Sequence, residues 1–554
     1  MNKQILAVAV MALLASCSGF KMGELTSDNF KVVPNPLEAE QGQVTATING
    51  VFPEKFMNKK ATVTVTPELR YTKDGQPAVK LDAPATFIGE KVLGNYQVIP
   101  FKEGGHYAMK STFDYEPAMQ QSELWMKVDA YYKDKKYELP AVKVVDGVLA
   151  TSELYHQTLT TATPCVATDS YQRVIAQKQE ANIKFLIQQA ELRKSELKSN
   201  SVQEFVNLLQ RISADREGLN LQNVEVSAYA SPDGGVALNE KLANKRQSNT
   251  EKYVEQQLKK ANVDGAVEAN YTAQDWEGFQ QLVAASDIQD KDVILRVLSM
   301  YKDPQEREQQ IKNLSHGFRE LADGILPELR RARLTINYET VGRSDEQILS
   351  QLKADPSKLS IEEILYAATL TDNIDEKLMI YNAATAVYPD DKRAYNNIAA
   401  LGYTQGVDAF QDGFTRAEVL PEAKANLGLI ALKEGDIARA EQLIASASGA
   451  EGLSEVMGNL QLAKGNYVLA EQQFKDIKSN SAALAQIMNK NYAKAEQTLK
   501  AITNPDGMTY YLQAIVNARQ GNQSAAASLL QKAIEKDSSL KQYAEKDLEL
   551  VKLR

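Results

Sequence analysis

A short motif that recurs along the carboxyl-terminal part of the chain constrains the fold more than any other feature. Its fullest form is Gly-Asp-Ile-Ala-Arg-Ala-Glu-Gln, and its copies begin at Gly435, Gly465, Asn491 and Gly521. In each copy a turn precedes a helical stretch with an alanine suited to close contact with a neighbouring helix. Repetition at intervals of about 20–50 residues is typical of stacked helical units, because one unit cannot bury its apolar face alone. The motif therefore predicts an all-α solenoid over residues 341–554.

Apolar residues of matching size accompany the motif. Asn426-Leu-Gly428 and Gly458-Asn-Leu460 supply small residues to a first helix. Phe474 and Tyr381 are large residues placed late in a second helix. These words resemble tetratricopeptide repeats, of which the chain has room for about five or six. The resemblance implies a concave surface that binds peptides or partner proteins. The alternative is that the array only packs against the rest of the chain.

Residues 24–150 alternate between apolar and polar side chains. The clearest runs are Gln43–Gly50, Ala61–Thr66 and Leu124–Ala130, and turn residues separate them. Many short strands with such breaks predict an all-β sandwich. We interpret Trp125, Tyr131 and Tyr132 as core or sheet-surface residues rather than as a binding face. The Thr- and Ala-rich stretch that follows predicts a linker over residues 151–179.

A strand, a turn and a helix follow one another between Val224 and Val254. An alternating run ends at Pro232-Asp-Gly-Gly235, and a polar-faced helical segment begins directly afterwards. Further strands are expected at 183–187, 266–271 and 329–338, with helices at 201–212 and 238–260 and a helical insert at 276–326. This order predicts a central α/β sandwich with a helical insert over residues 180–340.

This central region resembles a known family. It contains the motifs Asn239-x-x-Leu242-x-x-x-Arg246 and Leu329-Arg-Arg-Ala-Arg-Leu334. Both are similar to motifs of the OmpA C-terminal domain, which binds peptidoglycan. The stretch Tyr229–Gly234 and the segment Trp276-Glu-Gly278 resemble a variant from outer-membrane proteins of Bacteroidota. The resemblance implies that the domain holds the diaminopimelate of the peptide stem. A helix arginine would take its carboxylate and a loop aspartate its ammonium, since a guanidinium pairs with a carboxylate in two parallel bonds.

Four residues form the predicted peptidoglycan-binding site. Arg246 falls on the family arginine, whereas Ser231 stands where the family has its aspartate. Asp233, two positions further on, is the candidate replacement, and Asn239 belongs to the same motif. The alternative is a retained scaffold whose site has decayed, with Arg246 as a solvated helix residue and Asp233 as a turn former.

The amino terminus has the features of a secretory signal. Met1-Asn-Lys3 is followed by the apolar run Ile5–Leu14 and then by Ala15-Ser-Cys17. The ending resembles the lipobox of bacterial lipoproteins, which implies a signal peptide over residues 1–16 and an acylated (palmitate-bearing) Cys17; a plain secretory signal is the alternative. Ser18 is not the aspartate that retains enteric lipoproteins at the inner membrane, so we expect an outer-membrane lipid anchor facing the periplasm.

Composition argues against several functions. The three histidines and two cysteines show no metal-ligand spacing, and no phosphate loop or nucleophile–base set is present, so we expect no metal, no cofactor and no enzyme. The net charge of -9 disfavours nucleic acid as a partner.

The sequence thus predicts a lipoprotein that tethers the outer membrane to peptidoglycan and holds envelope or outer-membrane proteins through its repeats. The alternative is an interaction or assembly lipoprotein without peptidoglycan binding. A carbohydrate-related role for the β domain is a weaker third possibility.

Overall fold

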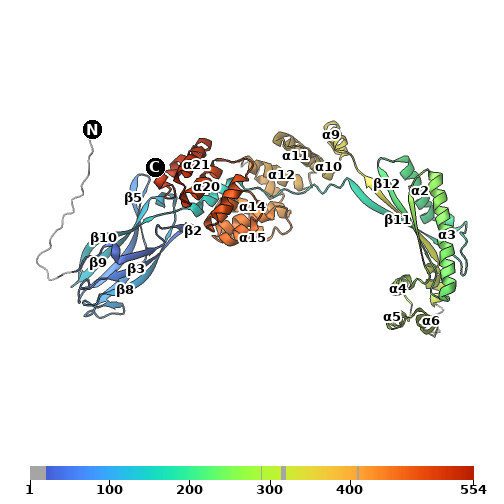
Figure 1. Cartoon of the computed structure of the whole chain (residues 1–554), viewed down its shortest axis with the longest axis horizontal. Helices are drawn as coiled ribbons and strands as arrows, with labels where there is room; N and C mark the ends of the chain where they lie inside the picture. Colours follow the sequence, from blue (N-terminus) through green and yellow to red (C-terminus); the bar gives the residue numbers. More distant parts are fainter. Residues whose placement is uncertain (1–19, 21, 289, 314–319, 408–410, 554) are drawn as a thin grey trace. The chain divides into compact units, whose positions relative to one another are not determined.

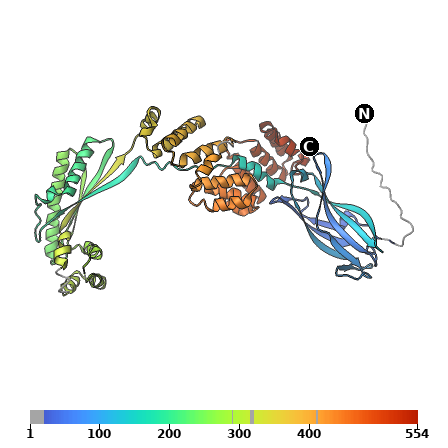
Figure 2. The same ribbon diagram turned by 180° about the vertical axis from the view of Figure 1, so that it is seen from behind.

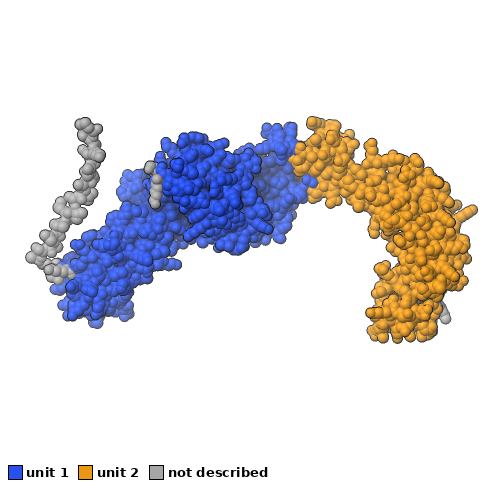
Figure 3. Space-filling view, viewed as in Figure 1, with its two compact units in different colours: residues 1–169, 371–554 blue, residues 170–370 orange. Residues whose placement is uncertain are grey.

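The chain divides into two compact units. The structure is a computed structural model and describes residues 20–553 except 21, 289, 314–319 and 408–410 (Figure 1). One unit contains residues 1–169 and 371–554, and the other contains residues 170–370 (Figure 3). The predicted signal peptide and Cys17 lie outside the described residues. Among the described residues, no helix combines the length and the apolar character that crossing a bilayer requires.

The amino-terminal part of the first unit is a sandwich of two sheets (Figures 1 and 2). One sheet has the order β1-β3-β2 with β8 also on β3, and the other has the order β10-β9-β4-β6-β7 with β5 also on β4. The strands are β1 (Phe30–Val33), β2 (Ala39–Glu40), β3 (Gln43–Phe52), β4 (Thr62–Lys73), β5 (Gln76–Leu81), β6 (Ala85–Gly89), β7 (Gln97–Ile99), β8 (Gly105–Asp114), β9 (Ser122–Tyr132) and β10 (Lys135–Gly147). Alternate residues of β3, β4 and β9 are buried in one core, as the period of two requires. The predicted β-rich amino-terminal region is confirmed.

The carboxyl-terminal part of the first unit is all-helical, as predicted. Helices pair into antiparallel hairpins, each packed on the next. Their bounds are α11 (Ile374–Val387), α12 (Arg393–Thr404), α13 (Asp412–Arg416), α14 (Pro421–Lys433), α15 (Ile437–Ala445), α16 (Leu453–Ala463), α17 (Tyr467–Gln473), α18 (Asn480–Met488), α19 (Tyr492–Lys500), α20 (Gly507–Arg519), α21 (Gln523–Lys536) and α22 (Leu540–Ala544).

The repeat motif explains how each hairpin closes. Its glycine takes a left-handed backbone conformation between the two helices, with φ +81° at Gly435, and Lys490 adopts φ +62° in the copy that lacks the glycine. The motif alanine is fully buried in every copy, at Ala440, Ala470, Ala495 and Ala526. Gly458 admits the second helix closely, because a Cβ at this position would lie 2.6 Å from the Phe474 ring.

The second unit is a four-stranded sheet covered by helices. The sheet order is β11 (Val174–Lys184), β14 (Arg331–Val341), β12 (Leu219–Tyr229) and β13 (Ala266–Thr272), and only the β12–β13 pair is parallel. Helices α2 (Asn200–Ala214) and α3 (Val236–Ala261) bury apolar residues against this sheet. Strands and helices follow one another in the predicted order.

The helical insert has an apolar core of its own. It contains α4 (Trp276–Ala285), α5 (Lys291–Met300), α6 (Pro304–Asn313), a π-helical turn (Leu321–Ile325) and α8 (Leu326–Leu329).

Two boundaries differ from the sequence prediction. The first strand of the α/β unit runs over Val174–Lys184 rather than 183–187, because backbone pairing with β14 extends along a stretch that has no apolar alternation. Helices α9 (Asp345–Ala354) and α10 (Ile361–Ala367) belong to this second unit, so the carboxyl-terminal helical array of the first unit begins only after residue 370.

The close approach of β3 to Tyr107 gives a test of the sandwich core. A Cβ on Gly50 would lie 2.1 Å from the Tyr107 ring, so Gly50→Ala must displace a buried aromatic side chain. We expect a loss of about 1–3 kcal/mol and a lower unfolding temperature in calorimetry. Gly94→Ala is the matched control, because its nearest neighbour would be 3.7 Å away. Equal unfolding temperatures for the two variants would contradict this packing.

Candidate functional site

Arg246, the central residue of the predicted peptidoglycan site, is enclosed by backbone carbonyl groups. It lies on α3 with only 1% of its surface exposed. Its guanidinium donates to the carbonyl oxygens of Gln189 at 3.0 Å, Tyr229 at 2.8 Å and Leu186 at 3.3 Å. The ring of Phe185 lies 5.0 Å from the guanidinium carbon. Through these contacts Arg246 connects α3 to the end of β12 and to the segment that follows β11.

The electrostatic surroundings of Arg246 do not offer it a carboxylate partner. Burial, followed by the charge of Arg330, lowers the pKa of Arg246 to about 10, and Asp233 partly opposes this shift. The side chain therefore stays protonated at neutral pH. A buried cation satisfied by carbonyl groups is stable only while those bonds persist.

Asp233 and Ser231 are joined to a different arginine. Asp233 accepts a hydrogen bond from the Ser231 hydroxyl and another from Nη2 of Arg330 at 3.1 Å. Nε of Arg330 also donates to the Ser231 hydroxyl oxygen at 3.3 Å. The structure therefore brings Ser231 and Asp233 together, but the partner of Asp233 is Arg330 and not Arg246. Arg330 lies in the Leu329-Arg-Arg motif, which carried the family resemblance but was not assigned to the predicted site.

Asn239 holds the loop in place. Its amide donates to the carbonyl oxygens of Ser231 at 2.8 Å and Gly234 at 2.9 Å. These bonds fix the Pro-Asp-Gly-Gly turn against the first turn of α3. The side chain is 5% exposed, so its role here is to shape the loop.

A second arginine–carboxylate pair joins the sheet to the helical insert. Arg331 contacts Asp275 at 3.0 Å and stacks on Tyr229, with 4.6 Å from guanidinium carbon to ring centre. Asp275 also caps α4 by accepting from the backbone of Gly278 at 2.9 Å. Asp233 and Asp275 are thus both paired within the unit, and the arrangement stabilises the junction of strand, turn and insert.

A second candidate site lies in the helical array, where the structure corrects the linker prediction. Residues 151–167 are not an exposed connection. They form two short 3₁₀ turns (Thr151–Leu154 and Leu159–Thr161) around α1 (Tyr155–Thr158), followed by an extended run. We call residues 151–167 the strap. Its buried apolar side chains explain why it is ordered, since a polar linker would have nothing to bury.

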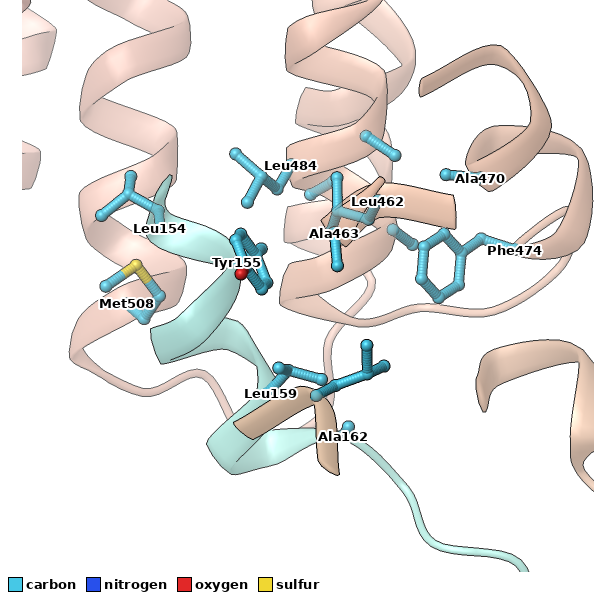
Figure 4. Close-up of a cluster of buried hydrophobic side chains, with 14 of the residues drawn as sticks. Leu154, Tyr155, Leu159, Ala162, Leu462, Ala463, Ala470, Phe474, Leu484 and Met508 are labelled. Carbon is cyan, nitrogen blue, oxygen red and sulfur yellow. The ribbon is translucent and has the colours of Figure 1, made fainter. Parts of the chain in front are cut away.

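The first half of the strap is apolar and packs among the helices (Figure 4). Leu154, Tyr155 and Leu159 lie in the same core as Leu484 and Met508. Polar groups support this contact. The Tyr403 hydroxyl donates to the carbonyl of Leu159 at 2.6 Å, and the hydroxyls of Ser481 and Thr158 lie 2.9 Å apart.

The second half of the strap is held by asparagine side chains of α12 and α14. Asn426 accepts from the backbone N–H of Cys165 at 2.7 Å and donates to its carbonyl at 2.8 Å. Asn397 binds both backbone groups of Ala167 in the same way, at 2.8 and 3.0 Å. Each amide thus replaces the partner that a neighbouring β-strand would supply. The arrangement is a peptide-binding groove, and its ligand is the chain's own backbone.

Two further side chains complete this groove. Asn396 donates to the carbonyl of Cys165 at 3.1 Å, and Glu455 accepts from the backbone of Thr163 at 3.0 Å. Burial raises the pKa of Glu455, and its hydrogen bonds with Thr163 of the strap partly oppose this rise. The sequence analysis did not identify these residues. Asparagines recur in α12, α14 and α16, at Asn396, Asn426 and Asn459, and all three are buried. This recurrence is the feature of the sequence that could have indicated the groove.

The remaining groups offer little reactive chemistry. Cys165 is buried, and burial raises the pKa of its thiol to about 12, which disfavours the reactive thiolate. Among the residues that the structure describes, no group of three His, Cys, Asp or Glu side chains is placed to hold a metal ion.

Comparison with known proteins adds only distant likenesses. No protein-family model matches the sequence, and no curated protein matches it. Among solved structures, a tetratricopeptide repeat protein from Parabacteroides merdae is 15% identical over 44% of this chain and 98% of its own, with a TM-score of 0.27. The anaphase-promoting-complex assembly Cut9–Hcn1 is 13% identical over 57% and 77%, with a TM-score of 0.29. Yeast Tom70 is 12% identical over 64% and 82%, with a TM-score of 0.23. The assignment of helical repeats therefore depends on the hairpins and motif of this chain itself.

Release of the strap can be measured through Cys165. Asn426→Ala leaves the backbone N–H of Cys165 without its asparagine partner and its carbonyl with Asn396 alone, so we expect the strap to open more often. In a chain with Cys17→Ser, thiol labelling of Cys165 should accelerate by about tenfold or more, because each 1.4 kcal/mol corresponds to roughly tenfold. Asn522→Ala is the control, since this exposed asparagine donates to the side chain of Asn517 on α20 rather than to the strap. An unchanged labelling rate in Asn426→Ala would show that the asparagine does not hold the strap.

Proposed function

We propose that this chain is a non-enzymatic interaction scaffold of the cell envelope, anchored to the outer membrane through an acylated Cys17 and facing the periplasm. The sequence around Cys17 supports the anchor. The helical array supports the scaffold role, because stacked hairpins present an extended surface to partners. The strap already occupies the groove, so partners are expected on the outer helices of the array.

We further propose that the α/β unit keeps the framework of a peptidoglycan-binding module without an open binding site. The order of its elements supports the resemblance to the OmpA C-terminal domain. The observation that carries the proposal is the enclosure of Arg246 by three carbonyl groups, with Asp233 joined to Arg330. A zwitterion would have to displace these internal bonds before it could use both charges, and that displacement lowers its affinity. The geometry therefore favours an interaction lipoprotein over a peptidoglycan tether.

A peptidoglycan pull-down separates these two functions. The test uses the soluble full-length chain with Cys17→Ser and purified peptidoglycan. We expect any retention of this chain to be the same with and without the Asp233→Asn substitution. Asp233→Asn is the better test variant because Asp233 is partly exposed. Arg246→Ala would instead remove a buried side chain that donates to three backbone carbonyls, and would destabilise the fold. Retention of the unmutated chain that Asp233→Asn abolishes, with an unchanged unfolding temperature, would establish the tether instead.

The outer face of the array can be tested for partners directly. Val468 and Leu469 are adjacent on α17 and exposed, at 63% and 49%. A photo-crosslinking amino acid at Val468 should give discrete covalent adducts with envelope proteins in cells. The same amino acid at Val79, a valine on β5 that is also exposed, at 52%, is the control. Identical adducts at both positions, or none at Val468, would contradict a partner surface on this face.

A further inference from the structure

One end of the β-sandwich concentrates positive charge. Three neighbouring segments form this end: residues 53–60, residues 89–103 and the hairpin turn 133–136. We call them together the tip. They contain eight lysines and four carboxylates, which gives the tip a net charge of +4 in a chain with a net charge of -9.

The three segments are held together by specific contacts. Lys59 forms an ion pair with Glu90 at 2.9 Å, and its ammonium lies 5.6 Å from the Phe101 ring. The backbone of Lys91 donates to the carbonyl of Lys59 at 2.7 Å. The hairpin turn lies beside them, because Thr62 on β4 pairs with Tyr131 on β9.

Exposed apolar side chains lie among these lysines. Leu93 is fully exposed, and Tyr96 and Val98 are exposed at 57% and 48%. Isolated exposed apolar residues are ordinary, but three within six residues at one end of a domain form a small patch. A leucine and a tyrosine beside lysines suit the interface of a bilayer, where the ring and the methyl groups enter the headgroup layer and the ammonium groups meet anionic lipids.

The described chain also begins at the tip. Phe20 stacks on Tyr137, with ring centres 4.1 Å apart, and the sulfur of Met22 accepts from the backbone of Asn58 at 3.3 Å. Cys17 precedes Phe20 by three residues, which span at most about 11 Å when extended. A lipid on Cys17 would therefore hold the tip within reach of the bilayer surface.

The opposite end of the sandwich faces the helical array. Strand β4 runs from Thr62 beside the tip to Tyr71, which pairs with Ser122. The adjoining Gln121 donates to the carbonyl of Glu545 in the array at 3.1 Å. The patch therefore lies at the end of the sandwich opposite to the one that contacts the helical array.

We propose that the tip is a membrane-contact surface, in which Leu93 and Tyr96 enter the headgroup layer and the surrounding lysines bind anionic lipid headgroups. The proposal rests on the lipid anchor of the proposed function, and it adds a second contact that fixes the orientation of the sandwich on the bilayer. A basic surface beside the anchor adds electrostatic attraction to anionic headgroups and so strengthens attachment.

The first experiment places a fluorophore in the tip. Leu93→Cys is labelled with the environment-sensitive dye NBD on the acylated full chain, in vesicles of phosphatidylethanolamine and phosphatidylglycerol. Labelling favours this site because Cys165 is buried and reacts only when the strap opens. We expect a blue-shifted emission that spin-labelled lipids quench. Val79→Cys on β5 is the control, since it is exposed at the other end of β4 and should show neither effect. Equal emission and quenching at both positions, with the chain still bound to the vesicles, would overturn the proposal.

The second experiment is independent of the anchor. The full chain with Cys17→Ser is sedimented with the same vesicles, and we expect binding that added salt weakens. Replacing Lys55, Lys60 and Lys91 by Gln should lower vesicle binding by about tenfold or more. The control replaces the exposed Lys475, Lys478 and Lys532, which lie on the helical array. Equal binding by the two triple variants would overturn the tip contact, whereas a loss confined to the tip variant supports it even if Cys17 proves not to be acylated.

Discussion

The pairing of asparagine amides with the backbone of the strap is the interaction on which the first unit depends. An extended peptide buried among helices has no neighbouring strand, so its N–H and carbonyl groups need partners from side chains. Asn426 and Asn397 supply both groups to Cys165 and Ala167, respectively. Each bond contributes about 1 kcal/mol, but an unmade bond at such a buried site costs about 1–3 kcal/mol. The strap is therefore bound as a whole, and it ties the sandwich to the array.

The same principle explains the α/β unit. Arg246 is a buried cation whose hydrogen bonds are made to backbone carbonyls, and Asp233 finds its cation in Arg330. A charge that is fully used inside the fold is unavailable to a ligand unless the fold opens. Residues that resemble a binding motif can be required by the fold itself, so a functional interpretation must come from the partners that they have in the fold.

The two units and the tip suggest a division of labour in the proposed scaffold. The proposed role of the tip is to contact lipid. The strap holds the sandwich against the helical array, and the array exposes its outer helices. In this arrangement the groove of the array serves the internal stability of the chain. The interaction function then depends on surfaces that a search for an empty groove would overlook.

Local patterns in the sequence determined the elements. The repeat motif predicted the hairpins, since a turn glycine and a buried alanine are local requirements, and period-two alternation predicted the sandwich strands. The strand-turn-helix at Val224–Val254 was likewise visible, as was the order of elements in the α/β unit.

Only the tertiary structure decided which polar groups are partners. The pairing of Asp233 with Arg330 spans nearly a hundred positions, and the strap meets Asn426 across 261. A Thr- and Ala-rich stretch has the composition of a linker, and only the groove around it makes its order favourable. Burial and long-range hydrogen bonds depend on which surfaces meet, and that information is not contained in the local spacing of residues.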